Sequence, residues 1–258
     1  MPKIIANAHS VHRSESWQNF KSGVLQEIFD HKPFERGPFL FRGQGSVSWP
    51  LISSFDRWFT GDKSQKGPAS DRLMKLFEQE AEGLQIERDI WLDTPRRLAL
   101  AQHYGIPTRL LDWSESPYVA AFFAFAGLKQ ETLSNNKDHK VAVWCLDRRE
   151  ASVWTAEAGV EIVHVPSYGN ERVRSQLGWF TLLKAPYDSL EEYVSHFDKA
   201  PKALRQIQIP AKDVRRALAD LELMGITFTR IYPGIEGSAR TAVLRAKWEN
   251  EYRGPPPP

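Results

Sequence analysis

Residues 116–127 hold the feature that most constrains the fold, a helix that is apolar on every side. Ser116 can cap this helix, Pro117 suits its first position, and residues 118–126 contain hardly a polar group. Gly127 ends it. Because such a helix must be covered all round, it belongs in the centre of a domain. We therefore expect the rest of the chain to pack around it.

The remaining pattern mixes helices and strands without a regular βαβ rhythm, which favours an α+β fold. Apolar or alternating runs predict strands, and helical spacing next to capping signals predicts helices. We expect a mixed or antiparallel sheet core flanked by helices. The strands are expected at 39–41, 141–146, 179–183 and 226–232, the helices at 22–29, about 71–84, 94–104, 117–126, 211–221 and within 235–252, and the exposed loops at 60–69 and 129–139.

The chain of 258 residues shows no linker, so a single domain is expected. Residues 1–16 are polar and are expected to form an N-terminal arm or to carry a first strand. The domain itself is expected over residues 17–252. Residues 253–258 form a proline-rich tail that cannot continue a helix.

Composition argues against several classes of protein. The net charge of +2 gives no sign of a nucleic-acid partner. The one cysteine, Cys145, excludes an internal disulfide framework and a Cys-based zinc site, and its apolar neighbours predict a packing role. The histidines lack close ligand spacing, so no metal is predicted. Without a signal peptide or a membrane-length apolar run, we expect a cytoplasmic protein with no membrane partner.

The segment 39–45 reads as an apolar strand that ends on an arginine between phenylalanine and glycine. Arg42 offers five donors in a rigid fork, which suits phosphate recognition. Gly43, next to Gln44, would let a ligand approach the main chain closely. The plainer alternative is a strand that leads into a tight turn, with Arg42 paired to a surface carboxylate.

A second unusual segment, residues 102–114, packs polar and aromatic side chains between two capped helices. Thr94 and Pro95 begin the first of these helices, and Gly105 ends it. Connections held between rigid elements often carry binding groups. The structural alternative is that Arg109 pairs with Asp112 and that His103 binds a buried carbonyl.

These segments resemble the FRG domain, a family named for its Phe-Arg-Gly motif. The resemblance extends from about Trp17 to about Leu244. It is carried by Phe41 to Gln44, Ala101 to Gly105, Pro107 to Trp113, Pro117 to Ala124, Asn170 to Thr181 and Pro233 to Gly237.

The chain also resembles, more distantly, ADP-ribosyltransferases of the Arg-Ser-Glu type. These open on a strand ending in Arg-Gly, continue with a Ser-containing strand that runs into a helix, and close on a strand with a glutamate. Here Phe41 to Gly43 match the first strand, and Asp112 to Ser116 match the second strand, which leads into the helix containing Ala120. Glu171 or Gln176 matches the glutamate. This resemblance implies a split sheet, NAD or a related nucleotide as ligand, and a macromolecule as acceptor of ADP-ribose.

The resemblance also implies roles for individual residues. Arg42 would hold phosphate, Ser114 would orient the ribose, and a carboxylate would stabilise an oxocarbenium-like transition state. An aromatic ring, Tyr104 or Trp113, would stack on the nicotinamide. The implied catalytic candidates are Arg42, Glu171, Gln176 and His103, and the implied ligand-binding candidates are Arg42, Gly43, Gln44, Tyr104, Arg109, Asp112, Trp113 and Ser114.

Two other functions stay open. If Gln176 takes the place of the glutamate, the negative charge is missing, and Arg172 and Arg174 favour phosphate, so the domain would be a non-catalytic nucleotide-binding or interaction module. The second alternative is a metal-independent phosphodiester or nucleic-acid enzyme that uses His103, Arg42 and Asp112. All three functions need Arg42 to point into a cleft shared with Asp112.

Overall fold

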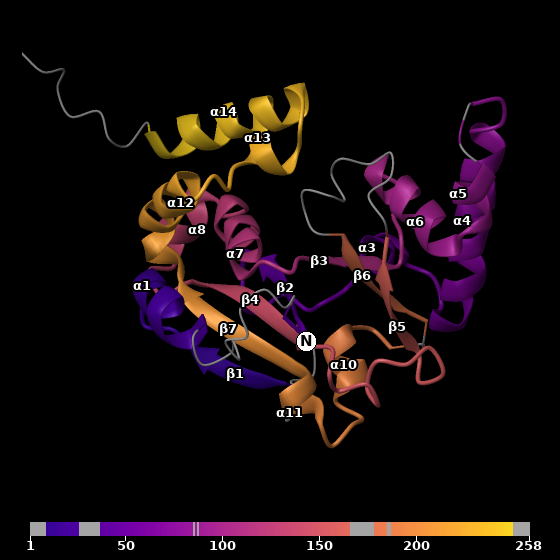
Figure 1. Cartoon of the computed structure of the whole chain (residues 1–258), viewed down its shortest axis with the longest axis horizontal. Coiled ribbons are helices and arrows are strands. Elements are labelled where there is room, and N and C mark those ends of the chain that lie inside the picture. Colours follow the sequence, from indigo (N-terminus) through magenta and orange to yellow (C-terminus); the bar gives the residue numbers. More distant parts are fainter. Residues whose placement is uncertain are drawn as a thin grey trace, which may run out of the picture.

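The computed structural model describes residues 9–25, 37–84, 86, 88–165, 178–184 and 187–249. Its strands form two sheets, shown in Figure 1. The first has the order β1-β7-β4-β2, with β1 Ser10–Arg13, β7 Leu204–Pro210, β4 Lys140–Asp147 and β2 Phe39–Gln44. The second has the order β3-β6-β5, with β3 Leu110–Trp113, β6 Trp179–Leu183 and β5 Val160–His164.

The first sheet is mixed and the second is antiparallel. In the first sheet, β1 runs parallel to β7, and the other pairs are antiparallel. Both pairs of the second sheet are antiparallel. Together with the helices, this arrangement confirms the predicted α+β class.

Within the described residues, a backbone bridge joins the two sheets between β2 and the end of β3. Phe41 and Ser114 exchange two backbone hydrogen bonds, each of 2.7 Å. This bridge brings two segments that are far apart in the sequence to the same place. It therefore sets the position of Arg42 relative to Asp112.

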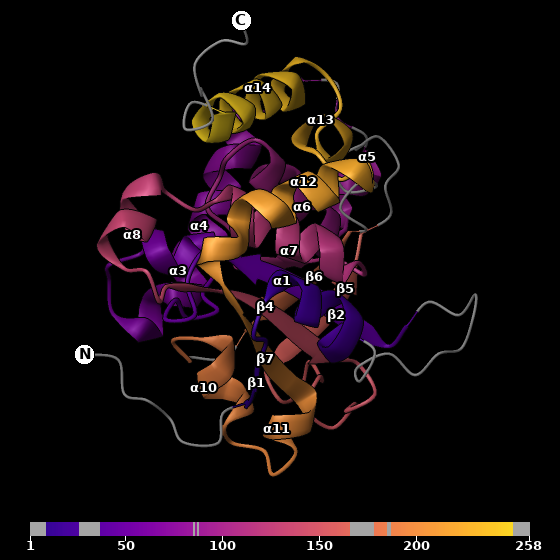
Figure 2. The same cartoon turned by 90° about the vertical axis from the view of Figure 1, so that its left-hand side faces the viewer.

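Helices surround the sheets, and most are short. They are α1 Trp17–Asn19, the π-helix η1 Phe20–Val24, α3 Ser54–Trp58, the 3-10 turn η2 Lys63–Gln65, α4 Lys66–Glu80, α5 Arg88–Leu92, α6 Thr94–His103, α7 Pro117–Ala126, α8 Gln130–Asn135, α10 Leu190–Val194, α11 Ala200–Ala203, the 3-10 turn η3 Ala211–Asp213, α12 Val214–Leu223, α13 Phe228–Ile231 and α14 Ile235–Glu249. Figures 1 and 2 show α13 and α14 at the end of the molecule opposite α10 and α11.

The central helix is α7, as predicted from its apolar sequence. Ser116 caps it by accepting a hydrogen bond from the backbone N–H of Val119 at 3.3 Å. Its apolar residues pack in one core cluster with β2, β4, β7 and α12. Gly43 of β2 lies so close that a Cβ atom there would be 1.8 Å from the carbonyl oxygen of Ala120. The close packing of α7 on β2 thus explains why a residue without a side chain occupies position 43.

The strand β4 is buried on both faces, which explains its continuous apolar run. Val141, Val143 and Cys145 pack in the cluster of α7 and α12. Trp144 and Leu146 belong to the cluster that includes α10 and α11. This alternation is the two-residue period of a strand. A third cluster packs α4 and α6 against the second sheet.

Several predicted elements are confirmed closely. The helix at 117–126 and the strand at 179–183 have the predicted limits. The strand at 141–146 extends by one residue at each end. The helix within 235–252 spans Ile235–Glu249, and the residues after it lie outside the described part. Of the helix expected at 22–29, the structure describes η1 and Leu25, and the rest lies outside it.

The strand predicted at 226–232 is wrong, because the segment contains the helix α13. Thr227 caps it and accepts a hydrogen bond from the backbone N–H of Arg230 at 3.3 Å. Gly225 and Gly234 have positive φ angles of 77° and 99° and turn the chain on both sides. The capping residue therefore determines the structure of this short segment, although its apolar and polar residues alternate as in a strand.

Both predicted loops contain helix, and a third segment contains an unpredicted strand. The loop at 60–69 includes η2 and the start of α4, where Pro68 is tolerated in the first turn. The loop at 129–139 includes α8, and the connection after Gly105 includes β3. The cap of α6 is Asp93 rather than Thr94, since Asp93 accepts from the N–H of Arg96 at 3.0 Å.

Two further observations bear on the predicted organisation. Residues 10–13, in the expected arm, form β1 at the edge of the first sheet. Within the described part of the chain, no helix combines the length and the apolar character that crossing a membrane requires. The tail at 253–258 lies outside the described residues.

Candidate functional site

A cavity of about 680 Å³ opens where the two sheets and α7 meet. Strand β2 and its turn line one side, the end of β3 lines another, and α7 lines a third. The segment between β2 and α3 adds Gly45, Trp49, Pro50 and Ile52 to the wall. The polar and aromatic residues on its walls include Arg42, Gln44, Trp49, Arg57, Asp112 and Trp113.

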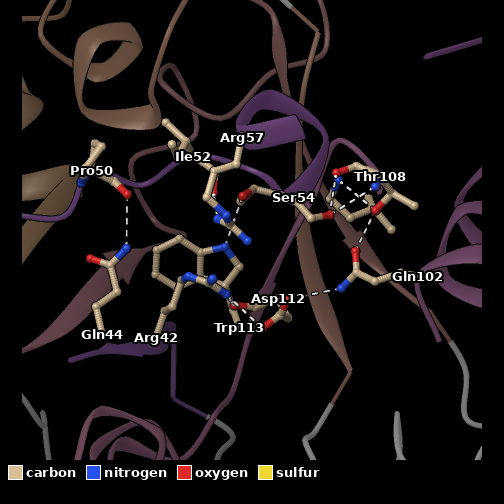
Figure 3. Close-up of polar contacts among 12 residues, drawn as sticks. Arg42, Gln44, Pro50, Ile52, Ser54, Arg57, Gln102, Thr108, Asp112 and Trp113 are labelled. Carbon is tan, nitrogen blue, oxygen red and sulfur yellow. Dashed lines mark hydrogen bonds and ion pairs between the residues drawn. The ribbon is translucent and has the colours of Figure 1, made fainter. Parts of the chain in front are cut away.

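Arg42 and Asp112 both line this cavity and form an ion pair with each other, drawn in Figure 3. The Nη1 atom of Arg42 donates to the Asp112 carboxylate at 2.7 Å and to its backbone carbonyl at 2.9 Å. The Arg42 side chain is 16% exposed and that of Asp112 is 48% exposed. The Nε atom of Arg42 is buried without a hydrogen-bond partner. A buried donor of this kind is commonly satisfied by a ligand or by water.

The carboxylate of Asp112 is held in place by a chain of side chains. Its other oxygen accepts from the Gln102 amide at 3.0 Å, and the Gln102 oxygen accepts from the Thr108 hydroxyl at 2.6 Å. The backbone N–H of Thr108 donates to the hydroxyl of Ser54 at 3.0 Å. This chain, drawn in Figure 3, links β3, α6 and α3. It fixes α3 beside the cavity.

Arg57 is a second guanidinium in the cavity, and the sequence did not single it out. It lies on α3, which Ser53 caps by accepting from the N–H of Asp56 at 3.0 Å. Its Nη1 donates to the carbonyl of Ile52 at 2.8 Å. Partial burial lowers the pKa of Arg57 below its ordinary value, and the positive charge of Arg42 lowers it further. Two arginines thus share a cavity in which, among the described lining residues, Asp112 alone carries a carboxylate.

Gln44 lines the cavity and is held by two hydrogen bonds. Its amide donates to the carbonyl of Pro50 at 3.1 Å, and its oxygen accepts from the Trp144 indole at 2.7 Å. Both ends of the amide are therefore used to hold the loop after β2 against the sheet. A ligand-binding role for Gln44 and Gly43 stays a prediction, since packing accounts for both residues.

Two more predicted residues lie on the cavity wall. Ser114 forms the bridge between the sheets, and its hydroxyl accepts from the N–H of Ser116 at 3.0 Å. Trp113 is buried, and its indole donates to the Thr181 hydroxyl at 3.0 Å. Both residues thus hold β3 in position.

The other described candidates do not line the cavity. Tyr104 is 70% exposed at the end of α6, where its ring contacts that of His103 edge to face. Arg109 donates to the carbonyl of Leu183, and burial lowers its pKa. The structural alternative, in which Arg109 pairs with Asp112, is therefore wrong, because Asp112 pairs with Arg42. Glu171 and Gln176 lie outside the described residues.

The site shows no sign of a metal centre in the described part of the chain. No group of three or more His, Cys, Asp or Glu side chains there is placed to hold a metal ion.

Residues 37–133 match the family model of the FRG domain. The chain therefore contains an FRG domain, and the predicted resemblance is confirmed over this range. The matched residues include β2, α3, β3 and α7, which form most of the cavity wall. The motifs expected near 170–181 and 233–237 lie beyond them. Comparison with curated proteins and with solved structures finds no match.

Proposed function

We propose that this cavity binds NAD or a related nucleotide and that the protein transfers ADP-ribose to a macromolecule. The pair of guanidiniums, Arg42 and Arg57, is the observation that carries the proposal. The one described carboxylate on the wall already accepts from Arg42, so positive charge is left in excess. Guanidinium forks are well suited to the oxygens of a pyrophosphate.

The size and lining of the cavity support a nucleotide as ligand. Its volume of about 680 Å³ is in the range of small-molecule sites. Val119, Ala120 and Phe123 of α7 give it an apolar wall beside the charged end. A nucleotide has the same division, with phosphate at one end and a planar ring at the other.

The chemistry of the transfer explains which groups are required. The bond between ribose C1′ and the nicotinamide nitrogen breaks, and its electron pair goes to the cationic ring, which leaves neutral. The acceptor's nucleophile then bonds to C1′ and releases its proton to water. Arg42 and Arg57 would hold the pyrophosphate still while positive charge develops on the ribose. Glu171, or Gln176 in its place, is the proposed group near that charge.

A non-catalytic nucleotide-binding module is the second candidate. Asp112 favours it, because both carboxylate oxygens already accept hydrogen bonds, from Arg42 and from Gln102. A carboxylate so engaged offers little free negative charge to a transition state. The third candidate, a phosphodiester or nucleic-acid enzyme, has less support because His103 lies outside the cavity wall.

Incubation with NAD that carries separate labels on nicotinamide and adenine tests the proposal. We expect the wild type to release free nicotinamide and to transfer the adenine label to protein. The variants Arg42→Ala, Arg57→Gln and Glu171→Gln should lose both activities. Arg96→Gln is the control, since Arg96 is a surface arginine on α6 paired with Asp93. Nicotinamide release that persists in both cavity variants contradicts the assignment.

The same samples separate the alternatives. NAD that raises the melting temperature of the wild type without turnover favours the non-catalytic module. Loss of added RNA or DNA favours the nucleic-acid enzyme.

A further inference from the structure

Trp49 is an exposed aromatic side chain on the wall of the cavity. It is 54% exposed, whereas Trp113, the other tryptophan on that wall, is 2% exposed and has its indole N–H bound to Thr181. Single exposed apolar residues are common on protein surfaces. This one, however, lies in a cavity that also contains Arg42 and Arg57.

The backbone around Trp49 holds the ring in place. A Cβ atom on Gly45 would lie 3.4 Å from the Cη2 and Cζ3 atoms of the indole, so the ring rests against the Gly45 main chain. Pro50 follows directly, and its carbonyl accepts from Gln44 at 3.1 Å. The backbone N–H of Trp49 donates to the carbonyl of Ser46 at 3.4 Å. The ring is thus supported on one side and half exposed to solvent.

The geometry points to Trp49 as the stacking platform for the planar heteroaromatic ring of the nucleotide whose phosphates Arg42 and Arg57 bind. This inference rests on the proposed function and adds to it the residue that recognises the ring. It also replaces the sequence-based assignment of stacking to Tyr104 or Trp113, of which the first lies outside the cavity wall and the second is buried.

Stacking on an indole has a predictable selectivity. Every base has a π-face, so Trp49 would bind adenine and nicotinamide rings alike and would not distinguish bases by hydrogen bonding. Removal of the indole should weaken the binding of ring-containing ligands only. Inorganic pyrophosphate, which has no ring, should bind the arginines equally well without it.

Calorimetric titration of NAD, ADP and inorganic pyrophosphate tests this inference. Trp49→Ala should weaken NAD and ADP binding about 5- to 150-fold, the range that loss of one stacking contact gives. Pyrophosphate binding should be unchanged, and Trp49→Phe should keep most of the affinity. Trp58→Ala is the matched control, because Trp58 is 56% exposed and lies outside the cavity wall.

Four outcomes overturn the inference. ADP binding that is as tight in Trp49→Ala as in the wild type overturns it and leaves the proposed function standing. An equal loss of ADP and pyrophosphate binding, or an equal loss in Trp58→Ala, shows a structural effect instead of stacking. If the wild type binds none of the three ligands, the proposed function fails as well.

Discussion

The guanidinium of Arg42 lies 2.7 Å from the carboxylate of Asp112, although 70 positions separate the two residues in the sequence. The backbone bridge between Phe41, one residue before Arg42, and Ser114, two residues after Asp112, brings them together by joining the two sheets. The charged pair therefore marks the junction of the sheets. It also orients the guanidinium that we propose binds phosphate.

Asp112→Ala should lower the free energy of unfolding. The change removes acceptors for Arg42 and Gln102, but the carboxylate is half exposed, so water can replace part of the loss. We expect about 1 kcal/mol by denaturant titration. Asp112→Asn, which keeps one oxygen acceptor, should cost less. Unchanged stability in Asp112→Ala would show that the ion pair does not hold the sheets together.

Gly43→Ala should be strongly destabilising. The added Cβ would lie 1.8 Å from the carbonyl oxygen of Ala120, so β2 or α7 must move. Overpacking of this kind costs about 1–3 kcal/mol or more. Gly67→Ala is the control, since a Cβ on Gly67 meets nothing within 4 Å and the residue lies in α4. Equal melting temperatures for the two variants would contradict the packing of α7 on β2.

Thr181→Val should destabilise the second sheet. The hydroxyl of Thr181 accepts from the Trp113 indole, and both side chains are buried. Without it, a buried N–H has no acceptor, which costs about 1–3 kcal/mol in unfolding free energy. The exposed residue Thr60 provides the control, and Thr60→Val should change little. A Thr181→Val variant as stable as the control would indicate that the indole N–H has another partner.

The thiol of Cys145 should be unreactive in the native protein. It is fully buried between the sheet and α7, and burial raises its pKa to about 12. Thiolate is the reactive form, so a maleimide or disulfide reagent should react only after unfolding. Because the chain has one cysteine, the readout is unambiguous. Rapid labelling without denaturant would contradict the placement of β4 in the core.

Glu191→Gln should change how stability depends on pH. Both carboxylate oxygens accept from the N–H of Leu51 at 2.9 Å, and burial raises the pKa of Glu191 above its ordinary value. An acid with a raised folded-state pKa contributes stability at low pH that is lost as pH rises through that pKa. Glutamine at position 191 keeps an oxygen acceptor for the N–H of Leu51 but carries no charge that depends on pH.

Melting temperatures of both proteins from about pH 4 to neutrality check this prediction. The melting temperature of the variant should rise relative to that of the wild type as pH rises. A variant whose melting temperature falls relative to that of the wild type as pH rises would show that the charged form of Glu191 is favoured by the fold.

Local signals predicted part of the fold well. The limits of α7 follow from Ser116, Pro117 and Gly127, which act within a single turn and need no tertiary context. The strand predicted at 226–232 failed because alternation over so few residues does not distinguish a strand from a capped helical turn. Thr227 and the flanking glycines decided it.

The site was predictable only in part, for a physical reason. Arg42 in β2 and Asp112 in β3 lie next to a glycine and a tryptophan in unusual short motifs, which the sequence makes visible. Arg57 reaches the cavity because Ser54 bonds to Thr108, a contact across 54 positions. Trp49 lies on the cavity wall because the Gln44 amide donates to the carbonyl of Pro50 and so holds the loop that follows β2. Such long-range contacts leave no periodic pattern in the chain.

A crystal structure of the wild type soaked with NAD would show where the pyrophosphate and the rings of the ligand bind. We expect pyrophosphate oxygens within hydrogen-bonding distance of both Arg42 and Arg57. We also expect a planar ring of the ligand against Trp49. NAD bound elsewhere on the molecule, with the two guanidiniums still in contact only with Asp112 and Ile52, would contradict this expectation.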